Sequence, residues 1–376
     1  MNHTNPNTGE LDGVPLVPKP TAEYVNPRQF EDYKAFRKNL IQWMNHLGKD
    51  PDRAEGYAYA TVRQRAYKLD RFYRWVWEQE DGYTLSMTPD HADQYIKHLI
   101  YEETSQTLKA GFQKALKTLF KYYRYEKGKD VEWEPEISFT ASSSTHQIKD
   151  FLSGEERRKL KQAVLEHGSI PHYNSLTPEE RDKWKAHLAQ RFEKPKSEVS
   201  KKDWDRANGW KYPSILYTTM DAGFRPIEVG RAKTSWLDLE NRLLRIPKEE
   251  STKNTENWHV ALSDQSCNML QHWLAERENY DKYQDTDALW LTRYGNPYSS
   301  SSLNRFLKKL CETAEIPVEN RSLTWYSIRH SVGTQMSRDQ GPAAVQQQLR
   351  QKSYEMAIRY DQAPVDDRQE TVNQWD

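Results

Sequence analysis

Four stretches in the first third of the chain carry apolar residues at three- and four-residue spacing, the pattern of amphipathic helices. A helix built this way has one apolar side, which must be buried against its neighbours. The first covers residues 28–48, the second and third begin at Thr61 and Thr88, and the fourth covers residues 105–126. We therefore predict a compact helical domain over residues 28–127, preceded by a flexible lead over residues 1–27.

Two of these helices carry basic residues away from the apolar side. A single basic helix is equally well explained as a solvated face. On the fourth helix, however, four basic residues follow at steps of three, four and three, so they share one face. Like charges on one face repel, and a polyanion relieves that repulsion and releases counterions. We therefore predict that this domain binds DNA through Arg63, Lys68, Arg71, Arg74, Lys114, Lys117, Lys121 and Arg124.

The overall composition sets limits on the class of protein. The chain has 55 basic and 55 acidic residues, a balance that neither requires nor excludes nucleic acid. Its mean hydropathy is −1.02, and no run of about 18 apolar residues occurs, so we expect no membrane association. Its two cysteines, Cys267 and Cys311, lack metal-ligand spacing and are typical of a reducing compartment. With no export signal in the sequence, we expect a cytoplasmic protein associated with the nucleoid.

The second part of the chain has a different pattern. Regular periodicity lapses over residues 128–150, which we interpret as a linker. A catalytic domain is then predicted over residues 151–376, mainly helical with one small antiparallel sheet of three strands. A polar stretch over residues 168–204 contains one expected helix and is interpreted as a surface elaboration. The strand-like runs are residues 235–239, 243–246 and 258–262.

Several catalytic signatures are missing from the sequence, including the phosphate-binding loop, the dinucleotide-binding glycine pattern, the zinc-protease motif and the serine-hydrolase motif. Three pieces remain, in a fixed order. Arg225 stands at an expected helix start, Lys253 lies in a polar turn before the third strand, and an Arg329-His330 pair precedes Tyr360. A tyrosine at a set distance beyond an arginine-histidine pair indicates covalent phosphate chemistry.

The order and spacing of these pieces resemble the tyrosine recombinase (phage integrase) family, of the Xer-like kind. DAGFRPIEVGR is similar to its first arginine box, WYSIRHSVGT to its His-x-x-Arg-His box, and QLRQKSYEMAIRYDQ to its Leu-Gly-His and tyrosine box. TVRQRAYKLDRFYRWVW is similar to a helix of the family's core-binding domain. The resemblance covers roughly residues 28–365. The sequences of these motifs are most similar to those of integrases from haloarchaea and their mobile elements.

This resemblance implies a tyrosine recombinase fold and an enzyme that cuts and rejoins DNA through a 3′-phosphotyrosyl intermediate, without metal or ATP. Arg225 and Arg329 would clamp the phosphoryl oxygens, because guanidinium forks fit these oxygens and stay charged. Glu228 would support the first arginine. Lys253 would protonate the leaving 5′ oxygen, and Tyr360 would be the nucleophile.

Two positions depart from the family pattern at the proton-transfer groups. Tyr326 replaces the usual first histidine of its box, and a phenol is a poor base near neutrality. Gln351 replaces histidine or tryptophan, with arginine in place of the preceding glycine; glutamine can donate a hydrogen bond but cannot shuttle a proton. His330 either shares the missing role or is structural. For the nucleophile the nearest rival is Tyr354, and for the general acid it is Lys248.

By the same resemblance, the partners are expected to be double-stranded DNA at an attachment or recombination site and three further copies of the chain, which form a tetramer on DNA. Two other interpretations stay open. The two departures favour a DNA-binding accessory protein that has kept the fold and lost turnover. The other alternative is a type IB topoisomerase or a telomere resolvase. The similarity to the core-binding helix counts against it, because that helix points to the integrase branch.

Overall fold

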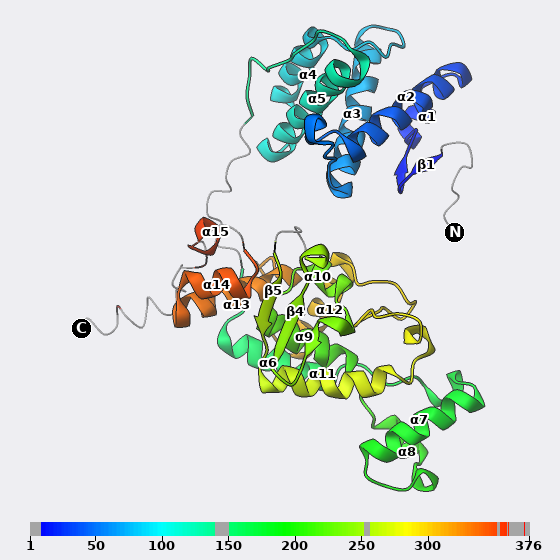
Figure 1. Ribbon diagram of the computed structural model, residues 1–376, viewed down its shortest axis with the longest axis vertical. Helices are drawn as coiled ribbons and strands as arrows, with labels where there is room; N and C mark the ends of the chain where they lie inside the picture. Colours follow the sequence, from blue (N-terminus) through cyan, green and yellow to red (C-terminus); the bar gives the residue numbers. More distant parts are fainter. Residues whose placement is uncertain are drawn as a thin grey trace. The chain divides into compact units, whose positions relative to one another are not determined.

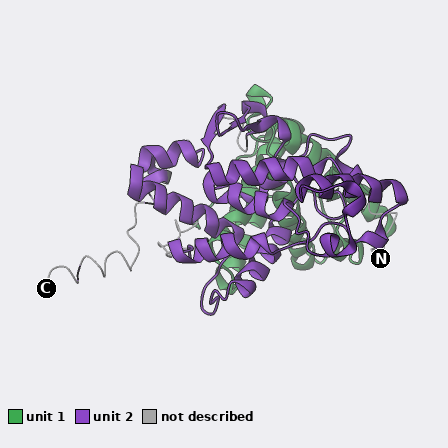
Figure 2. Ribbon diagram, turned by 90° about the horizontal axis from the view of Figure 1, so that it is seen from below, with its two compact units in different colours: residues 1–147 green, residues 148–376 purple. Residues whose placement is uncertain are grey.

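The computed structural model describes residues 9–139, 150–251, 256–351, 354–358, 360 and 372. The chain divides into two compact units, residues 1–147 and residues 148–376, coloured separately in Figure 2. Each has its own apolar core. Within the described part of the chain, no helix has both the length and the apolar character needed to cross a membrane. No group of His, Cys, Asp and Glu in that part is arranged to hold a metal ion.

Unit 1 is a helical domain whose four long helices pack through their apolar sides. Figure 1 shows how these helices are arranged. The helix starts follow from local capping. Asn26 and Gln29 form a reciprocal capping box, and the Ser105 side chain accepts a bond from the Leu108 amide. The elements are β1 (Glu10–Leu11), β2 (Val14–Pro15), α1 (Lys19–Ala22), α2 (Pro27–His46), α3 (Tyr59–Gln79), α4 (Pro89–Tyr101) and α5 (Gln106–Lys127).

The segment before α2 belongs to the core of unit 1, so the flexible lead predicted over residues 1–27 is wrong from residue 9 onward. Val14 and Val17 are fully buried in that core. The buried Arg37 guanidinium of α2 donates to the carbonyl oxygens of Leu16 (2.6 Å) and Pro15 (3.0 Å). Backbone carbonyls are recognised whatever the side chain, so helical periodicity gave no signal for this packing.

The predicted linker also begins too early, because residues after α5 fold back onto unit 1. Trp133 is buried and its indole donates to Asp93 Oδ1 at 3.0 Å. The Gln113 amide of α5 bonds the backbone of Ile137 and Phe139. The rest of the predicted linker, apart from residue 150, lies outside the described residues.

Unit 2 is mostly helical and contains one small antiparallel sheet, as predicted (Figure 1). Its strands are β3 (Leu237–Asp238), β4 (Leu243–Ile246) and β5 (Trp258–Ala261), in that spatial order. In the register, Leu244 lies opposite both Leu237 and Val260. The helices are α6 (Gly154–Leu165), α7 (Pro178–Arg191), α8 (Lys201–Asp205), α9 (Lys211–Ala222), α10 (Pro226–Arg231), α11 (Asp264–Arg277), α12 (Ser300–Thr313), α13 (Trp325–Gln340), α14 (Pro342–Gln348) and α15 (Tyr354–Ile358).

Helices α7 and α8 form a separate small lobe of unit 2, inserted between α6 and α9. Trp184 and Trp204 are buried in a core of their own. The two ends of the insertion meet where Ser169 and Asn208 pair as an antiparallel bridge. In Figure 1 this lobe lies at the end of unit 2 that is remote from α13, α14 and α15.

Candidate active site

The first part of the site is the turn between α9 and α10. Gly223 ends α9 in the left-handed conformation (φ +56°), and Pro226 begins α10. Arg225 stands between them and interacts twice with Glu228, three residues on. Its backbone amide donates to Glu228 Oε2 (2.7 Å), and its Nη1 donates to Oε1 (2.8 Å). The carboxylate therefore caps α10 and bonds the Arg225 guanidinium. The supporting role of Glu228 in a reaction stays a prediction.

The same carboxylate has a second arginine partner that the sequence did not reveal. Arg350 Nη2 donates to Glu228 Oε2 at 2.8 Å, and the Arg350 side chain is almost completely buried. Burial alone would raise the pKa of Glu228, but the cations Arg350, Arg225 and Arg329 outweigh it and hold this pKa well below its ordinary value. Glu228 is therefore a carboxylate, shared between two guanidinium groups.

Arg329 is fully buried on α13 and joins two backbone segments of the site. Its Nη1 donates to Gly223 O at 2.7 Å, and its Nη2 donates to Leu349 O at 2.5 Å. Burial, together with the neighbouring cations Arg225 and Arg350, lowers the pKa of Arg329 to about 10. This value still leaves the guanidinium charged at neutral pH, so a fixed positive charge lies beneath the turn that carries Arg225.

Tyr360 packs against α13 close to this buried charge. It is 7% exposed, and its hydroxyl accepts a hydrogen bond from Gln351 Nε2 at 3.2 Å. Its ring centroid lies 5.5 Å from that of His330, and the His330 ring lies 5.0 Å from Tyr326. Burial raises the pKa of Tyr360, whereas Arg329 and Gln351 oppose that rise. The structure thus brings Tyr360, Gln351, His330 and Tyr326 into one cluster.

The rival residues are placed differently. Tyr354 is 53% exposed on α15. Lys253, the predicted general acid, lies outside the described residues. Lys248, its competitor, is exposed after β4, and its backbone amide donates to Asn257 Oδ1 at 2.8 Å, which joins the two sides of the turn.

The basic residues predicted on α3 differ in their surroundings. Arg63 is exposed and lies over the ring of Tyr67. Arg71 pairs with Glu102 (2.5 Å), and Arg74 pairs with Asp70 (3.4 Å). Lys68 is partly buried beside Gly111, and this burial, with Arg65 nearby, lowers its pKa.

On α5 the predicted basic face is partly neutralised by the segment that folds back after the helix. Lys117 pairs with Glu134 (2.5 Å) and Arg124 with Glu132 (3.2 Å), in both cases at exposed positions. Lys121 donates to the carbonyl oxygens of Gly48 (3.3 Å) and Lys49 (2.9 Å). Lys114 is exposed.

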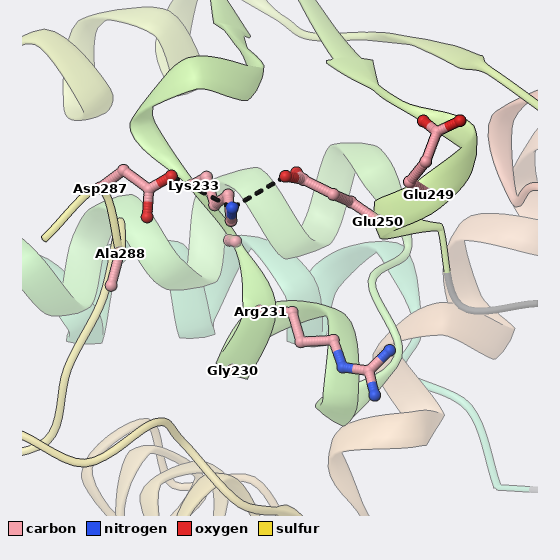
Figure 3. Close-up of a pocket in the computed structure, with 8 residues that line it drawn as sticks. Gly230, Arg231, Lys233, Glu249, Glu250, Asp287 and Ala288 are labelled. Carbon is pink, nitrogen blue, oxygen red and sulfur yellow. Dashed lines mark ion pairs between the residues drawn. The ribbon is translucent and has the colours of Figure 1, made fainter. Parts of the chain in front are cut away.

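A separate pocket of unit 2 lies beside the sheet and is shown in Figure 3. At its centre Lys233 Nζ pairs with Glu250 Oε1 (2.8 Å) and Asp287 Oδ2 (3.2 Å). These pairs hold together three segments: the residues just after α10, those after β4, and the stretch between α11 and α12. The pocket contains none of the predicted catalytic residues, so the candidate active site is the Arg225–Tyr360 region.

The helical architecture with a three-stranded antiparallel sheet is the tyrosine recombinase fold. Among solved structures, the chain is similar to the XerH site-specific recombinase bound to its palindromic difH substrate, with a TM-score of 0.56, 16% identity and coverage of 93% of this chain and 89% of that one. It is also similar to the Tn1549 transposon integrase in complex with transposon right end DNA, with a TM-score of 0.52, 12% identity and coverage of 89% and 99%. The predicted fold class is therefore confirmed.

Residues 200–365, which lie in unit 2, match the phage integrase family. The resemblance drawn from the sequence is thus confirmed for this segment, which includes both arginine boxes and Tyr360. The comparison with curated proteins finds no match.

Proposed function

We propose that the chain is a site-specific DNA recombinase that cuts and rejoins duplex DNA through a 3′-phosphotyrosyl intermediate. The observation that carries this proposal is the clustering of Tyr360 and Gln351 beside the buried Arg329, within a segment that matches the phage integrase family. A phenol held beside a fixed cation is suited to attack an anionic phosphodiester.

In the proposed reaction, the Tyr360 oxygen attacks the phosphorus and the bond from phosphorus to the 5′ oxygen breaks. The phenol loses its proton, and the leaving 5′ oxygen gains one. Because a phosphotyrosyl ester replaces the phosphodiester, the bond energy is retained and religation by the 5′ hydroxyl is the reverse reaction. This chemistry requires neither ATP nor a metal ion.

The two arginines have different tasks in this proposal. Arg225 is partly exposed, with 19% of its side chain accessible, so it can contact a phosphoryl oxygen directly. Arg329 lies beneath it and donates to backbone carbonyls, so it stabilises the developing negative charge and fixes the site's geometry.

Proton transfer is assigned to groups on both sides of the reacting phosphate. Lys253 is proposed as the general acid for the leaving oxygen, in line with the family resemblance. On the nucleophile's side, Gln351 donates a hydrogen bond that favours the phenolate, while Tyr326 and His330 complete the polar surroundings of Tyr360. Glutamine cannot accept the phenol proton and a neutral tyrosine is a poor base, so the nearby cations are proposed to lower the barrier to deprotonation.

The proposed partner is duplex DNA, since the similar structures are described as recombinases or integrases in complex with DNA. Unit 1 would contact the phosphate backbone through the basic residues of α3 and α5. Exchange between two duplexes needs an active site for each of the strands cut, so we propose a tetramer on DNA, in the cytoplasm and associated with the nucleoid. From the motif sequences, we propose that the chain is an integrase of a haloarchaeal mobile element.

The test is trapping of a covalent adduct on a nicked duplex. Binding sequences are selected from a random pool with the Tyr360→Phe variant, and the selected duplexes are nicked so that cleavage releases a short strand and prevents religation. Wild-type protein is expected to form an adduct that withstands denaturing electrophoresis. Tyr360→Phe should abolish it, whereas Tyr354→Phe, the matched control, should retain it.

An adduct that persists in Tyr360→Phe and disappears in Tyr354→Phe would move the nucleophile to α15. Sequence-specific binding by the wild type without any adduct would contradict the recombinase proposal and favour an accessory DNA-binding protein. Relaxation of supercoiled DNA without a defined site would instead support a topoisomerase.

A further inference from the structure

Arg350 occupies a backbone position that favours glycine. Its φ is +55°, in the left-handed region that a residue with a Cβ adopts at an energetic cost. The motif resemblance also expects glycine here. At this position the arginine side chain makes hydrogen bonds that a glycine would lack.

The Arg350 guanidinium is fully occupied by the site itself. It donates to Glu228 Oε2 (2.8 Å) and Oε1 (3.4 Å), and to the carbonyl oxygens of Ala222 (2.8 Å) and Gln348 (2.8 Å). Only 2% of its side chain is exposed. Arg350 is therefore not a group that touches substrate, and any effect on the reaction must pass through its partners.

Its principal partner, Glu228, also binds Arg225. Without Arg350, the Arg225–Glu228 pair has a formal charge of zero, and a phosphoryl oxygen reaching Arg225 would also meet the carboxylate's negative charge. With Arg350 added, the group of three carries one net positive charge. In a buried site with a low effective dielectric constant, that difference acts strongly on an approaching dianionic transition state.

We propose that Arg350 is a positioning residue that neutralises Glu228, so that Glu228 can hold the Arg225 side chain in place without cancelling its charge toward the scissile phosphate. This proposal rests on the recombinase function proposed above. It gives a reason for arginine at this position in a chain whose next residue, Gln351, lacks the charge that histidine can carry. In this chain the positive charge is carried by Arg350, which lies beneath the site, instead of by a histidine at position 351.

The test uses charge rescue. Arg350→Met removes the charge at similar length and takes away one of the cations, with Arg225 and Arg329, that act on the Glu228 carboxylate. The double variant Arg350→Met with Glu228→Gln removes both charges, while the glutamine oxygen still accepts from the Arg225 backbone amide. Arg350→Lys keeps the charge and loses the two-pronged geometry. All are compared with wild type by the single-turnover rate of adduct formation at saturating protein, by DNA affinity, and by thermal unfolding.

We expect Arg350→Met to slow adduct formation about 10- to 100-fold with DNA affinity little changed, because charge stabilisation in the transition state is lost. The double variant and Arg350→Lys should recover to within about tenfold of the wild-type rate. Recovery in the double variant shows that the uncompensated Glu228 charge causes the loss of rate. Thermal unfolding of the same variants then separates an effect on the reaction from a loss of stability, because removing both partners of a buried ion pair can also restore stability.

A wild-type rate in Arg350→Met would overturn the proposal, and so would a double variant slower than Arg350→Met. If Arg350→Met fails to fold, the double variant is tested alone. A double variant that forms adduct no faster than Tyr360→Phe would overturn the proposal. Failure of the recombinase proposal is distinguished at once, because the wild type would then form no adduct.

Discussion

Gly333 on α13 lies directly against the ring of Tyr360, so that a Cβ added at Gly333 would come within 2.3 Å of Tyr360 Cδ1. The ring of Tyr360, the proposed nucleophile, thus packs against α13 at a position that has no side chain. Any larger residue at position 333 would push the ring away from Gln351 and Arg329.

The first prediction concerns this seat. Gly333→Ala is expected to lower the rate of adduct formation at least about 100-fold, because a small misplacement of a reacting group has effects of that order. Overall folding should be retained, since Tyr360 packs in a small apolar cluster that is separate from the main core of unit 2. Gly154→Ala is the matched control, because a Cβ there meets open space. Equal rates in Gly333→Ala and wild type would show that Tyr360 reacts from another position.

The second prediction concerns the hydrogen bond from Gln351 to the Tyr360 hydroxyl. This bond opposes the effect of burial, so Gln351→Leu should raise the pKa of Tyr360 further. Because the attacking phenol must lose its proton, the pH–rate profile should move to higher pH and the rate at neutral pH should fall about tenfold or more. Single-turnover rates between about pH 6 and 9 measure this. A superimposable profile for Gln351→Leu would exclude the role given to this side chain.

The third prediction concerns the acidic partners on unit 1. Changing Glu132 and Glu134 to glutamine releases Arg124 and Lys117 from their ion pairs. We expect tighter DNA binding at low salt and a dependence of log affinity on log salt that is steeper by up to about 0.9 for each released cation. Fluorescence anisotropy across a salt series measures both quantities.

The control for this prediction is Glu31→Gln, which removes the acidic partner of Lys34 on α2, a helix that carries none of the predicted DNA-binding residues. If the control tightens binding equally, the effect is one of net charge. The basic face of α5 would then lose its special role.

The fourth prediction concerns stability. Asp70 is buried in unit 1, accepts bonds from Thr21 (2.7 Å) and Tyr33 (3.1 Å), and lies 3.9 Å from the Arg37 guanidinium. Asp70→Asn leaves that guanidinium without its counter-charge and should lower the free energy of unfolding of unit 1 by about 3 kcal/mol. Glu78→Gln, an exposed acid on the same helix, should change it by less than about 0.5 kcal/mol. Chemical denaturation followed by tryptophan fluorescence compares the two.

The fifth prediction concerns pH and the buried Glu276 of α11. Burial raises its pKa from 4.5 to about 7, against the opposing effects of the Trp210 amide, Tyr280, Arg191 and Lys211. A raised pKa in the folded state means that this group stabilises unit 2 fully below about pH 4.5 and that the contribution is lost as pH rises through about 7.

Wild-type protein should therefore lose on the order of 3 kcal/mol of stability from this group between those limits. Glu276→Gln should remove that loss and be the more stable protein at about pH 8. Denaturant unfolding at several pH values measures the difference, with the exposed Glu278→Gln as control. Parallel curves for Glu276→Gln and wild type would contradict the assignment.

The parts of the fold that sequence could predict are those fixed by neighbouring residues. Apolar spacing located the long helices, and alternation with polar turns located the strands that became β4 and β5. The Arg225–Glu228 pair was also predictable, because residues three apart meet within one helical turn. The packing of residues 9–27 was not, since it depends on backbone carbonyls bound by Arg37.

The sequence proposes individual residues for the candidate site, but the network that joins them could not be predicted from it. Arg350 and Glu228 stand 122 positions apart, and no local pattern connects them. The sequence indicated a special role for position 350 only through the arginine that replaces the expected glycine. That replacement did not identify Glu228 as its partner. Likewise, the spacing of the α5 lysines defined a shared face but gave no indication that Glu132 and Glu134 would return to cover part of it.

The bridge between Ser169 and Asn208 has a consequence for engineering. The Ile170 amide bonds the Ala207 carbonyl at 3.4 Å, so the chain leaves the domain and re-enters it at one point. Closing so short a gap with a tight turn costs little loop entropy. The α7–α8 lobe still contacts the rest of unit 2, because Trp184 packs on Tyr280 and Lys183 pairs with Asp281. A fluorescent protein or a foreign targeting module grafted at the attachment point, remote from α15, therefore has to leave these two contacts in place.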